Sequence, residues 1–176
     1  AKKIVDESRS SKIVVVLSAM GKTTDQLVSL ANKCSKNPDG RDYDLLVSSG
    51  EQVSISLLSM AIKQLGKDSI AYTGWQAGIK TNNTHASARI TQIDTSRIKK
   101  SLKEGKIVII AGFQGINSGS ITTLGRGGSD TSAVAIAAAL KASECQIYTD
   151  VDGVYTTDPR VCNKARKVDT MTYEEM

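Results

Sequence analysis

The pattern of hydrophobic positions predicts several short strands separated by helices. Ile13–Leu17 and Ile107–Ala111 are unbroken runs of apolar, mostly β-branched residues, which is the pattern of strands buried on both faces. Four further runs of strand-forming residues are Ser69–Thr73, Arg89–Ile93, Ile121–Thr123 and Cys145–Thr149.

Between the strands, the apolar residues recur at the period of helices. Helices are predicted over residues 2–9, 24–34, 49–65 and 95–104, and over an Ala-rich segment that ends at Leu140. The apolar positions at helical spacing in the second long helix are Val53, Leu57, Met60, Ala61 and Leu65, and Gly66 is its predicted C-cap. Residues 35–42 are predicted to be a surface loop, 74–83 a turn or hairpin, and 112–119 a glycine-rich loop.

This alternation predicts an α/β fold with a mostly parallel sheet that helices cover on both faces. A length of 176 residues suits one domain with a substantial core. Thr172–Glu175 places Thr at an N-cap and Glu three positions later, so a further helix is expected to begin there. The chain therefore starts inside one helix and stops at the start of another, as expected of a piece of something longer.

Composition excludes several classes of protein. The formal net charge is only +5 and aromatic residues make up 4%, so a stacking platform for nucleic acid is not expected. Cys34, Cys145 and Cys162 are widely spaced and odd in number, which predicts no disulfide framework, no zinc site and a cytoplasmic location. No membrane span and no signal peptide are predicted.

The stretch from Ser120 to Leu140 carries the strongest chemical pattern. A β-branched run leads into Gly125-Arg-Gly-Gly128 and then into the Ala-rich helix, which Ser129 or Asp130 is expected to cap. A helix N-terminus behind a glycine turn offers free N–H groups to an anion. The alternative is a glycine-rich turn before a core helix. Arg126 favours the anion site, because a guanidinium can bind a carboxylate or phosphate with two hydrogen bonds.

Other polar loops follow strands and are expected at the same sheet edge. Ser18–Asp25 follows the first strand; its Gly21-Lys22-Thr23 is not a P-loop, because residue 16 is Val where the first glycine is required. Thr149–Arg160 follows the last strand and is rich in hydroxyl and acidic groups. Glu51 either complements a helix dipole or binds a substrate ammonium. His85, the single histidine, is predicted to be a loop residue.

Together these segments resemble the aspartate kinases of the amino acid kinase family. The matching blocks are Val16–Asp25, Ser49–Ser54, Thr73–Gly78, Ala111–Gly115, Thr122–Asp130 and Tyr148–Arg160, in family order. The resemblance implies a three-layer α/β/α sandwich and ATP- and Mg²⁺-dependent phosphorylation of the β-carboxylate of L-aspartate. It also implies an oligomer that binds neither nucleic acid nor a membrane.

The resemblance further implies a role for each matching residue. Arg126 would pair with the α-carboxylate of aspartate, Glu51 would lie near its ammonium, and Asp130 would organise the reacting groups. The residues implied for the aspartate side are Lys22, Thr23, Thr24, Glu51, Arg126, Gly127, Gly128, Ser129 and Asp130. Those implied for the nucleotide side are Ser18, Thr149, Asp150, Tyr155, Thr156, Thr157, Asp158, Pro159 and Arg160.

The chain also departs from the family's pattern. It shows no counterpart of the family's Lys-Phe/Tyr-Gly-Gly strand, whose lysine neutralises the transferred phosphoryl group, or of its C-terminal ACT domains. These 176 residues are therefore expected to be a partial catalytic domain with little or no activity alone. Two alternatives stay open: a relative acting on glutamate, N-acetylglutamate, carbamate or UMP, and a non-catalytic nucleotide-binding module.

Overall fold

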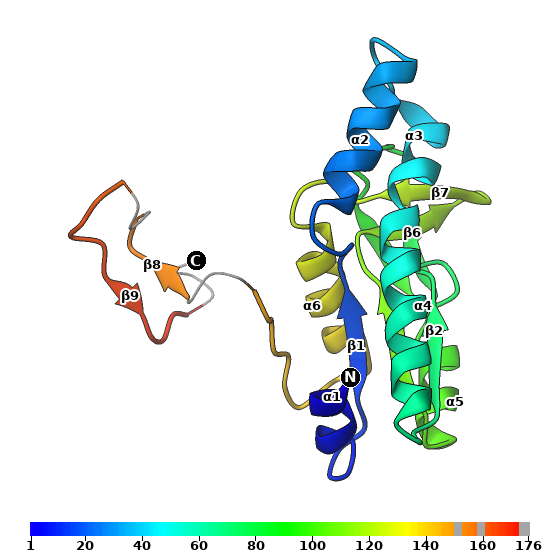
Figure 1. The fold of residues 1–176 in the computed structure, drawn as a ribbon, viewed down its shortest axis with the longest axis vertical. Helices are drawn as coiled ribbons and strands as arrows, with labels where there is room; N and C mark the ends of the chain where they lie inside the picture. The colour runs from blue at the N-terminus through cyan, green and yellow to red at the C-terminus, as the bar shows by residue number, and fades with distance from the viewer. Residues whose placement is uncertain (150–152, 158–160, 173–176) are drawn as a thin grey trace. The chain divides into compact units, whose positions relative to one another are not determined.

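A computed structural model describes residues 1–149, 153–157 and 161–172, which form two compact units, Ala1–Cys145 and Gln146–Met176 (Figure 1). The helices of the first unit are α1 (Lys2–Glu7), α2 (Thr23–Cys34), α3 (Gly40–Val47), α4 (Ser49–Gln64), α5 (Ser96–Lys103) and α6 (Gly128–Leu140). Its strands are β1 (Val14–Leu17), β2 (Ser69–Tyr72), β3 (Ile79–Thr81), β4 (Ile90–Ile93), β5 (Ile107–Ala111), β6 (Gln114–Asn117) and β7 (Ser120–Thr123). The second unit holds one antiparallel pair, β8 (Val154–Tyr155) with β9 (Lys167–Val168).

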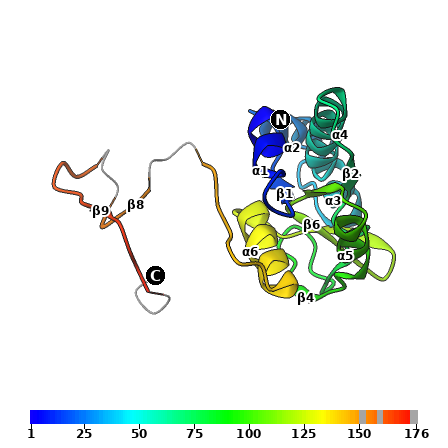
Figure 2. The same ribbon diagram turned by 90° about the horizontal axis from the view of Figure 1, so that it is seen from below.

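The first unit is built on a parallel sheet of order β1-β5-β2. Alternate residues of the fully buried β5 point to opposite faces, as the pleat requires. Ile107 and Ile109 pack with residues of α1 and α4, and Val108 and Ile110 pack with residues of α5 and α6. Figure 2 shows this order of layers, with α1 and α4 above the strands and α5 and α6 below them. The predicted α/β class, with helices on both faces of a parallel sheet, is confirmed.

A second sheet has the order β4-β3-β6-β7 and is mixed, because only β3 and β6 run parallel. The predicted glycine-rich loop 112–119 is therefore wrong in part, since it contains β6. A Cβ on Gly115 would lie 2.7 Å from the Thr81 side chain, so glycine lets β6 approach β3 closely. Such a strand shows no hydrophobic period, and only its neighbours in space define it.

Residues 35–39 form a surface loop as predicted, but residues 40–42 of the predicted loop belong to α3. Ser48 keeps helical dihedrals between α3 and α4, so Gly40–Gln64 forms one 25-residue helical stretch. By length and composition alone this stretch could cross a membrane. Its buried acidic side chains, Asp44 and Glu51, and the packing of Ile55 and Ile62 on the sheet identify it as a layer of the α/β fold.

The face of α4 that the sequence predicted to be apolar is the exposed one. Val53, Leu57 and Met60 are 50%, 45% and 59% exposed. The buried face carries Ile55 and Ile62 between small polar residues. Helix α4 has apolar residues nearly all round, so the period alone did not decide which side faces the sheet.

Two expectations at the C-terminal end have different outcomes. The predicted strand Cys145–Thr149 is wrong: these residues are exposed and have no strand structure. A strand forms only where a neighbouring strand completes its hydrogen bonds, and an apolar run does not supply that neighbour. The capping box lies in part outside the described residues, which end at Thr172. Cys34, Cys145 and Cys162 are free cysteines in the structure.

Candidate active site

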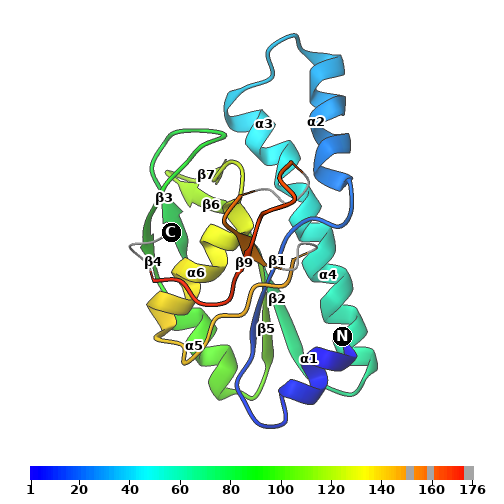
Figure 3. The ribbon, with the colours of Figure 1, turned by 90° about the vertical axis from the view of Figure 1, so that its left-hand side faces the viewer.

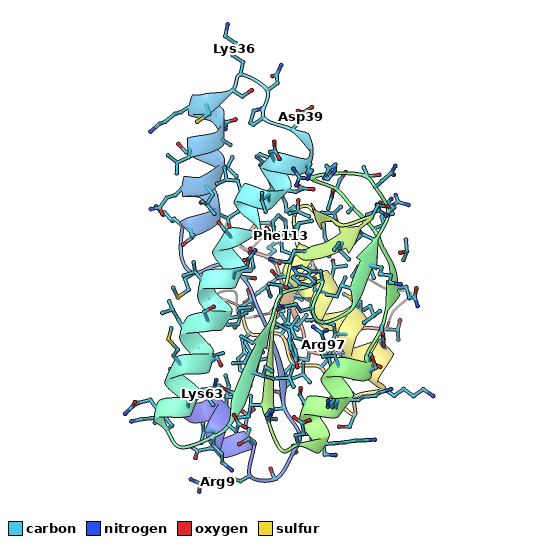
Figure 4. The ribbon with its side chains drawn as sticks, turned by 90° about the vertical axis from the view of Figure 1, so that its right-hand side faces the viewer. Arg9, Lys36, Asp39, Lys63, Arg97 and Phe113 are labelled. Carbon is cyan, nitrogen blue, oxygen red and sulfur yellow. The ribbon has the colours of Figure 1, made fainter. Side chains whose placement is uncertain are left out.

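The candidate site lies at the carboxyl edge of the parallel sheet. Strands β1 and β5 end here, and α4 and α6 begin here. Figure 4 shows Phe113, which follows β5, at this end of the strands, with Lys63 and Arg9 at the other end. Helices α2 and α3 pack side by side beyond this edge (Figure 3). The topology therefore brings the polar loops of the sequence to one edge, where ligands of open α/β sheets bind.

Glycines allow the start of α6 and the junction of α3 and α4 to approach the strand ends closely. A Cβ on Gly112 would lie 2.9 Å from the Cα of Ser129, at the start of α6. A Cβ on Gly50 would lie 2.9 Å from the Cβ of Ala19, in the loop after β1. Ser132 fixes the start of α6 further, since its hydroxyl accepts from the Phe113 N–H at 3.1 Å and donates to the Gly128 carbonyl at 2.7 Å.

A cavity of about 240 Å³ opens at the start of α6 and the junction of α3 and α4. Its lining residues are Ser18, Ala19, Thr24, Glu51, Phe113, Gly125, Arg126, Gly127, Gly128, Ser129 and Asp130. Most residues predicted for the aspartate side are therefore brought together, with Ser18 of the predicted nucleotide side. Lys22 and Thr23 do not line the cavity. A larger depression of about 450 Å³, between β2 and α5, contains none of the predicted site residues.

Glu51 is the most unusual group in the cavity wall. Its side chain is buried, and Oε1 accepts one hydrogen bond, from the Ala19 N–H at 3.0 Å. Oε2 is buried and has no partner among the described residues. Burial raises the pKa of the Glu51 carboxyl above its ordinary value. A helix dipole alone does not account for a carboxylate in this position, whereas a cationic ligand group would supply the missing partner.

Another part of the cavity wall is formed by the Gly125–Gly128 turn and the first turn of α6. Gly125 and Gly127 have φ of +81° and +71°, a conformation that favours glycine. Gly127 occupies the N-cap position, so the predicted cap at Ser129 or Asp130 is wrong: the left-handed glycine starts α6 earlier and leaves both residues inside the first turn. The free N–H groups there and the exposed Arg126 can bind an anion.

The predicted nucleotide residues belong mostly to the second unit. Asp150, Asp158, Pro159 and Arg160 lie outside the described residues. Thr149, Tyr155, Thr156 and Thr157 are described; the Thr156 N–H donates to the Arg166 carbonyl at 3.0 Å, and its hydroxyl accepts from the Arg166 N–H at 3.1 Å. No group of three His, Cys, Asp or Glu residues suited to a metal occurs in the described part of the chain.

Sequence reasoning missed three contributors near the site. Ala19 takes part through its backbone N–H, and Phe113 through its place in the cavity wall. Both lie in segments that resemble the family, but neither was assigned a role. Asp44 is fully buried and lies 2.6 Å from His85, which the sequence placed in a loop without a role. A carboxylate next to apolar helix positions was the one signal that could have indicated Asp44.

Comparison with known proteins supports a common origin along the whole chain. Aspartokinase 2 of Bacillus subtilis is 59% identical over 174 residues, which are 98% of this chain and 43% of that protein. An aspartate kinase crystal structure from Synechocystis superposes with a TM-score of 0.73 at 52% identity, over 94% of this chain and 27% of that one. E. coli aspartokinase III in complex with aspartate and ADP superposes with a TM-score of 0.81 at 28% identity, over 96% of this chain and 49% of that one.

The chain thus spans about 43% of the length of the curated relatives it matches. The family model described as amino acid kinase family matches residues 1–176, that is, every residue of the sequence. Because the match covers every residue and the relatives are more than 50% identical in sequence, the assignment to a family does not depend on the geometry of the cavity. The chain belongs to the amino acid kinase family.

Proposed function

We propose that the protein containing this chain is an ATP-dependent kinase that phosphorylates the β-carboxylate of L-aspartate to give 4-phospho-L-aspartate. One observation carries the proposal: Glu51 and Arg126 line the same small cavity, although they are far apart in the sequence. One buried carboxylate with a free oxygen and one guanidinium match the ammonium and the α-carboxylate of a free amino acid.

This pairing also argues against the other substrates of related kinases. An N-acylated amino acid has no ammonium, so the buried Glu51 oxygen would stay without a partner, at a cost in free energy. UMP and carbamate lack an ammonium as well. Glutamate keeps both groups and differs by one methylene, so the choice between glutamate and aspartate depends on the length of the cavity.

The proposed reaction needs binding and charge neutralisation more than proton transfer. The β-carboxylate of aspartate, with an ordinary pKa of about 4, is already ionised at neutral pH and needs no general base. Arg126 and Glu51 orient the amino acid, and the N–H groups at the start of α6 stabilise negative charge at the acceptor. Asp130, in the first turn of α6, orients the reacting groups and does not remove a proton.

Mg²⁺ supplies charge neutralisation at the transferred phosphoryl group when it is bound. The described residues contain no three-residue metal cluster, which fits an ion held mainly by nucleotide phosphates, the usual arrangement in kinases. Among the described residues, Ser18 is the predicted nucleotide residue that lies in the cavity wall. The nucleotide role of Thr149–Arg160 is part of this proposal.

A substrate panel on the full-length protein tests the proposal. ADP release with Mg-ATP is measured with aspartate, glutamate, N-acetylglutamate and UMP, and trapping with hydroxylamine detects the acyl phosphate. We expect turnover with aspartate and a hydroxamate product. Turnover with N-acetylglutamate or UMP instead, or calorimetric binding of both ligands without turnover, would overturn the proposal.

A further inference from the structure

Asp44 is the centre of a buried hydrogen-bond cluster formed with His85, Ala86 and Thr123, here called the Asp44 cluster. Its Oδ1 accepts from the Thr123 hydroxyl at 2.6 Å and from the Ala86 N–H at 3.0 Å. Its Oδ2 lies 2.6 Å from His85 Nδ1 and accepts from the Thr123 N–H at 3.1 Å. The Asp44 and Thr123 side chains are fully buried, and the His85 side chain is 28% exposed.

Every partner in the Asp44 cluster presents a donor to the carboxylate. Two backbone N–H groups and one hydroxyl donate to its two oxygens, and the Nδ1–H tautomer of His85 adds a fourth donor. Hydrogen bonds to a charged acceptor are about twice as strong as neutral ones. An amide at position 44 would turn its NH₂ group toward other donors. The cluster therefore specifically requires a carboxylate.

One side of the Asp44 cluster leads directly to the Gly125–Gly128 turn. Thr123 is the last residue of β7, three positions before Arg126. Its carbonyl accepts from the Ala88 N–H at 2.8 Å, so its backbone is fixed on both sides. The Ala86 carbonyl also lies 3.1 Å from where a Cβ on Gly125 would stand. The cluster thus fixes the strand end and the neighbouring turn from which Arg126 extends.

The other side of the Asp44 cluster leads to Glu51. Asp44 and Glu51 lie on the same continuous helical stretch, seven residues apart, which is about two turns or 10 Å along the axis. Gln114 donates to the Ser48 carbonyl at 2.9 Å and ties the junction of α3 and α4 to β6. A continuous helical stretch therefore connects the Asp44 cluster to Glu51 in the cavity wall. Strand β7 connects the cluster to the turn that carries Arg126.

We propose that Asp44 is a positioning residue that sets the separation between Glu51 and Arg126, and with it the affinity for the amino acid. The identity of that amino acid rests on the proposed function; the positioning itself does not. Loss of the Asp44 cluster lets the Gly125–Gly128 turn move relative to the helix that carries Glu51, so the two ends of the substrate are no longer bound together. No residue of the Asp44 cluster belongs to the proposed nucleotide residues, so the affinity for ATP is expected to change little.

Four variants of the full-length protein, one of them a matched control, test the role of Asp44. Thr123→Val removes the hydroxyl that bonds Oδ1 at nearly constant volume, and Thr123→Ser restores it. Asp44→Asn turns the NH₂ group of the amide toward the N–H and hydroxyl groups that donate to the Asp44 carboxylate. Asp42→Asn is the matched control, because Asp42 lies on the same helix with its side chain 86% exposed and paired with the neighbouring Arg41. The measurements are KM for aspartate and for ATP, kcat, and hydrogen exchange of backbone amides.

We expect Thr123→Val and Asp44→Asn to raise KM for aspartate about tenfold or more while KM for ATP changes less than about threefold. Thr123→Ser and Asp42→Asn should behave as the wild type. Amides of residues 84–88 and 124–131 should exchange faster in Thr123→Val, with β5 unchanged. Equal increases in both KM values, or unchanged exchange in Thr123→Val, would overturn the proposal. If the wild type does not phosphorylate aspartate, the proposed function fails, and the exchange comparison still decides the role of Asp44.

Discussion

Glu51→Gln should make the protein more stable and a poorer aspartate binder at the same time. The amide keeps an oxygen for the Ala19 N–H and the volume of the side chain, so one charge is the only large change. Because Glu51 is buried with one oxygen unpartnered, its charge costs free energy until a cationic group of the ligand arrives.

The stability effect has a defined dependence on pH. Burial raises the pKa of the Glu51 carboxyl above its ordinary value of 4.5, so as the pH rises the unfolded chain releases this proton first. Stability therefore falls between the ordinary pKa and the raised folded pKa, and the loss persists above it. The Glu51→Gln variant has no carboxyl to ionise at this position and therefore does not lose stability in this pH range. Its thermal midpoint should exceed that of the wild type at neutral pH, and the two should converge below about pH 4.5.

The affinity effect follows from the lost ammonium contact. A hydrogen bond to a charged group contributes about 1.5–3 kcal/mol, so KM for aspartate should rise about 10- to 150-fold. Thermal unfolding is measured without ligand and with saturating aspartate, and aspartate should stabilise the wild type more than the variant. Asp25→Asn is the matched control, since it removes an exposed carboxylate from the first turn of α2.

Two results would refute this reasoning about Glu51. A Gln variant less stable than the wild type at neutral pH would show that the carboxylate is paired in the free protein. An unchanged KM for aspartate, with Asp25→Asn also unchanged, would show that Glu51 does not contact the ligand. A rise in KM for ATP instead would place the nucleotide beside Glu51.

Three further predictions concern the site and the core. Arg126→Ala should raise KM for aspartate by an amount equivalent to about 1.5–3 kcal/mol and leave KM for ATP nearly unchanged; an equal effect on both would contradict the assignment. Gly112→Ala should destabilise the protein by about 1–3 kcal/mol in urea unfolding, because its Cβ would meet Ser129 at 2.9 Å; wild-type stability would show that α6 can shift. Ile62→Ala should lower the free energy of unfolding by about 2–5 kcal/mol and Met60→Ala by less than about 0.5, since Ile62 is fully buried and Met60 is 59% exposed. The reverse order would show that α4 packs on the sheet with the face expected from the sequence.

The sequence determined the parallel sheet, because buried parallel strands are recognisable as unbroken apolar runs. Ile13–Leu17 and Ile107–Ala111 carry that pattern, and both form strands close to these bounds. β5 is fully buried as predicted, whereas β1 is only half-buried, so the predicted burial of β1 on both faces is wrong. It also placed Arg126 behind a strand and before a helix, since a glycine turn followed by an Ala-rich segment has local propensities that agree with each other. In such elements the local sequence pattern favours the same secondary structure that the tertiary packing requires.

Tertiary structure alone decided the remaining features. Gln114–Asn117 is a strand only because glycine lets it approach β3, and α4 turns Ile62 inward because the sheet selects one side of an apolar helix. The Asp44–His85 contact joins residues 41 positions apart, and no local pattern in the sequence predicts it. Residues with complementary donors and acceptors find each other through packing, so the chemistry of the cavity depended on contacts that are distant along the chain.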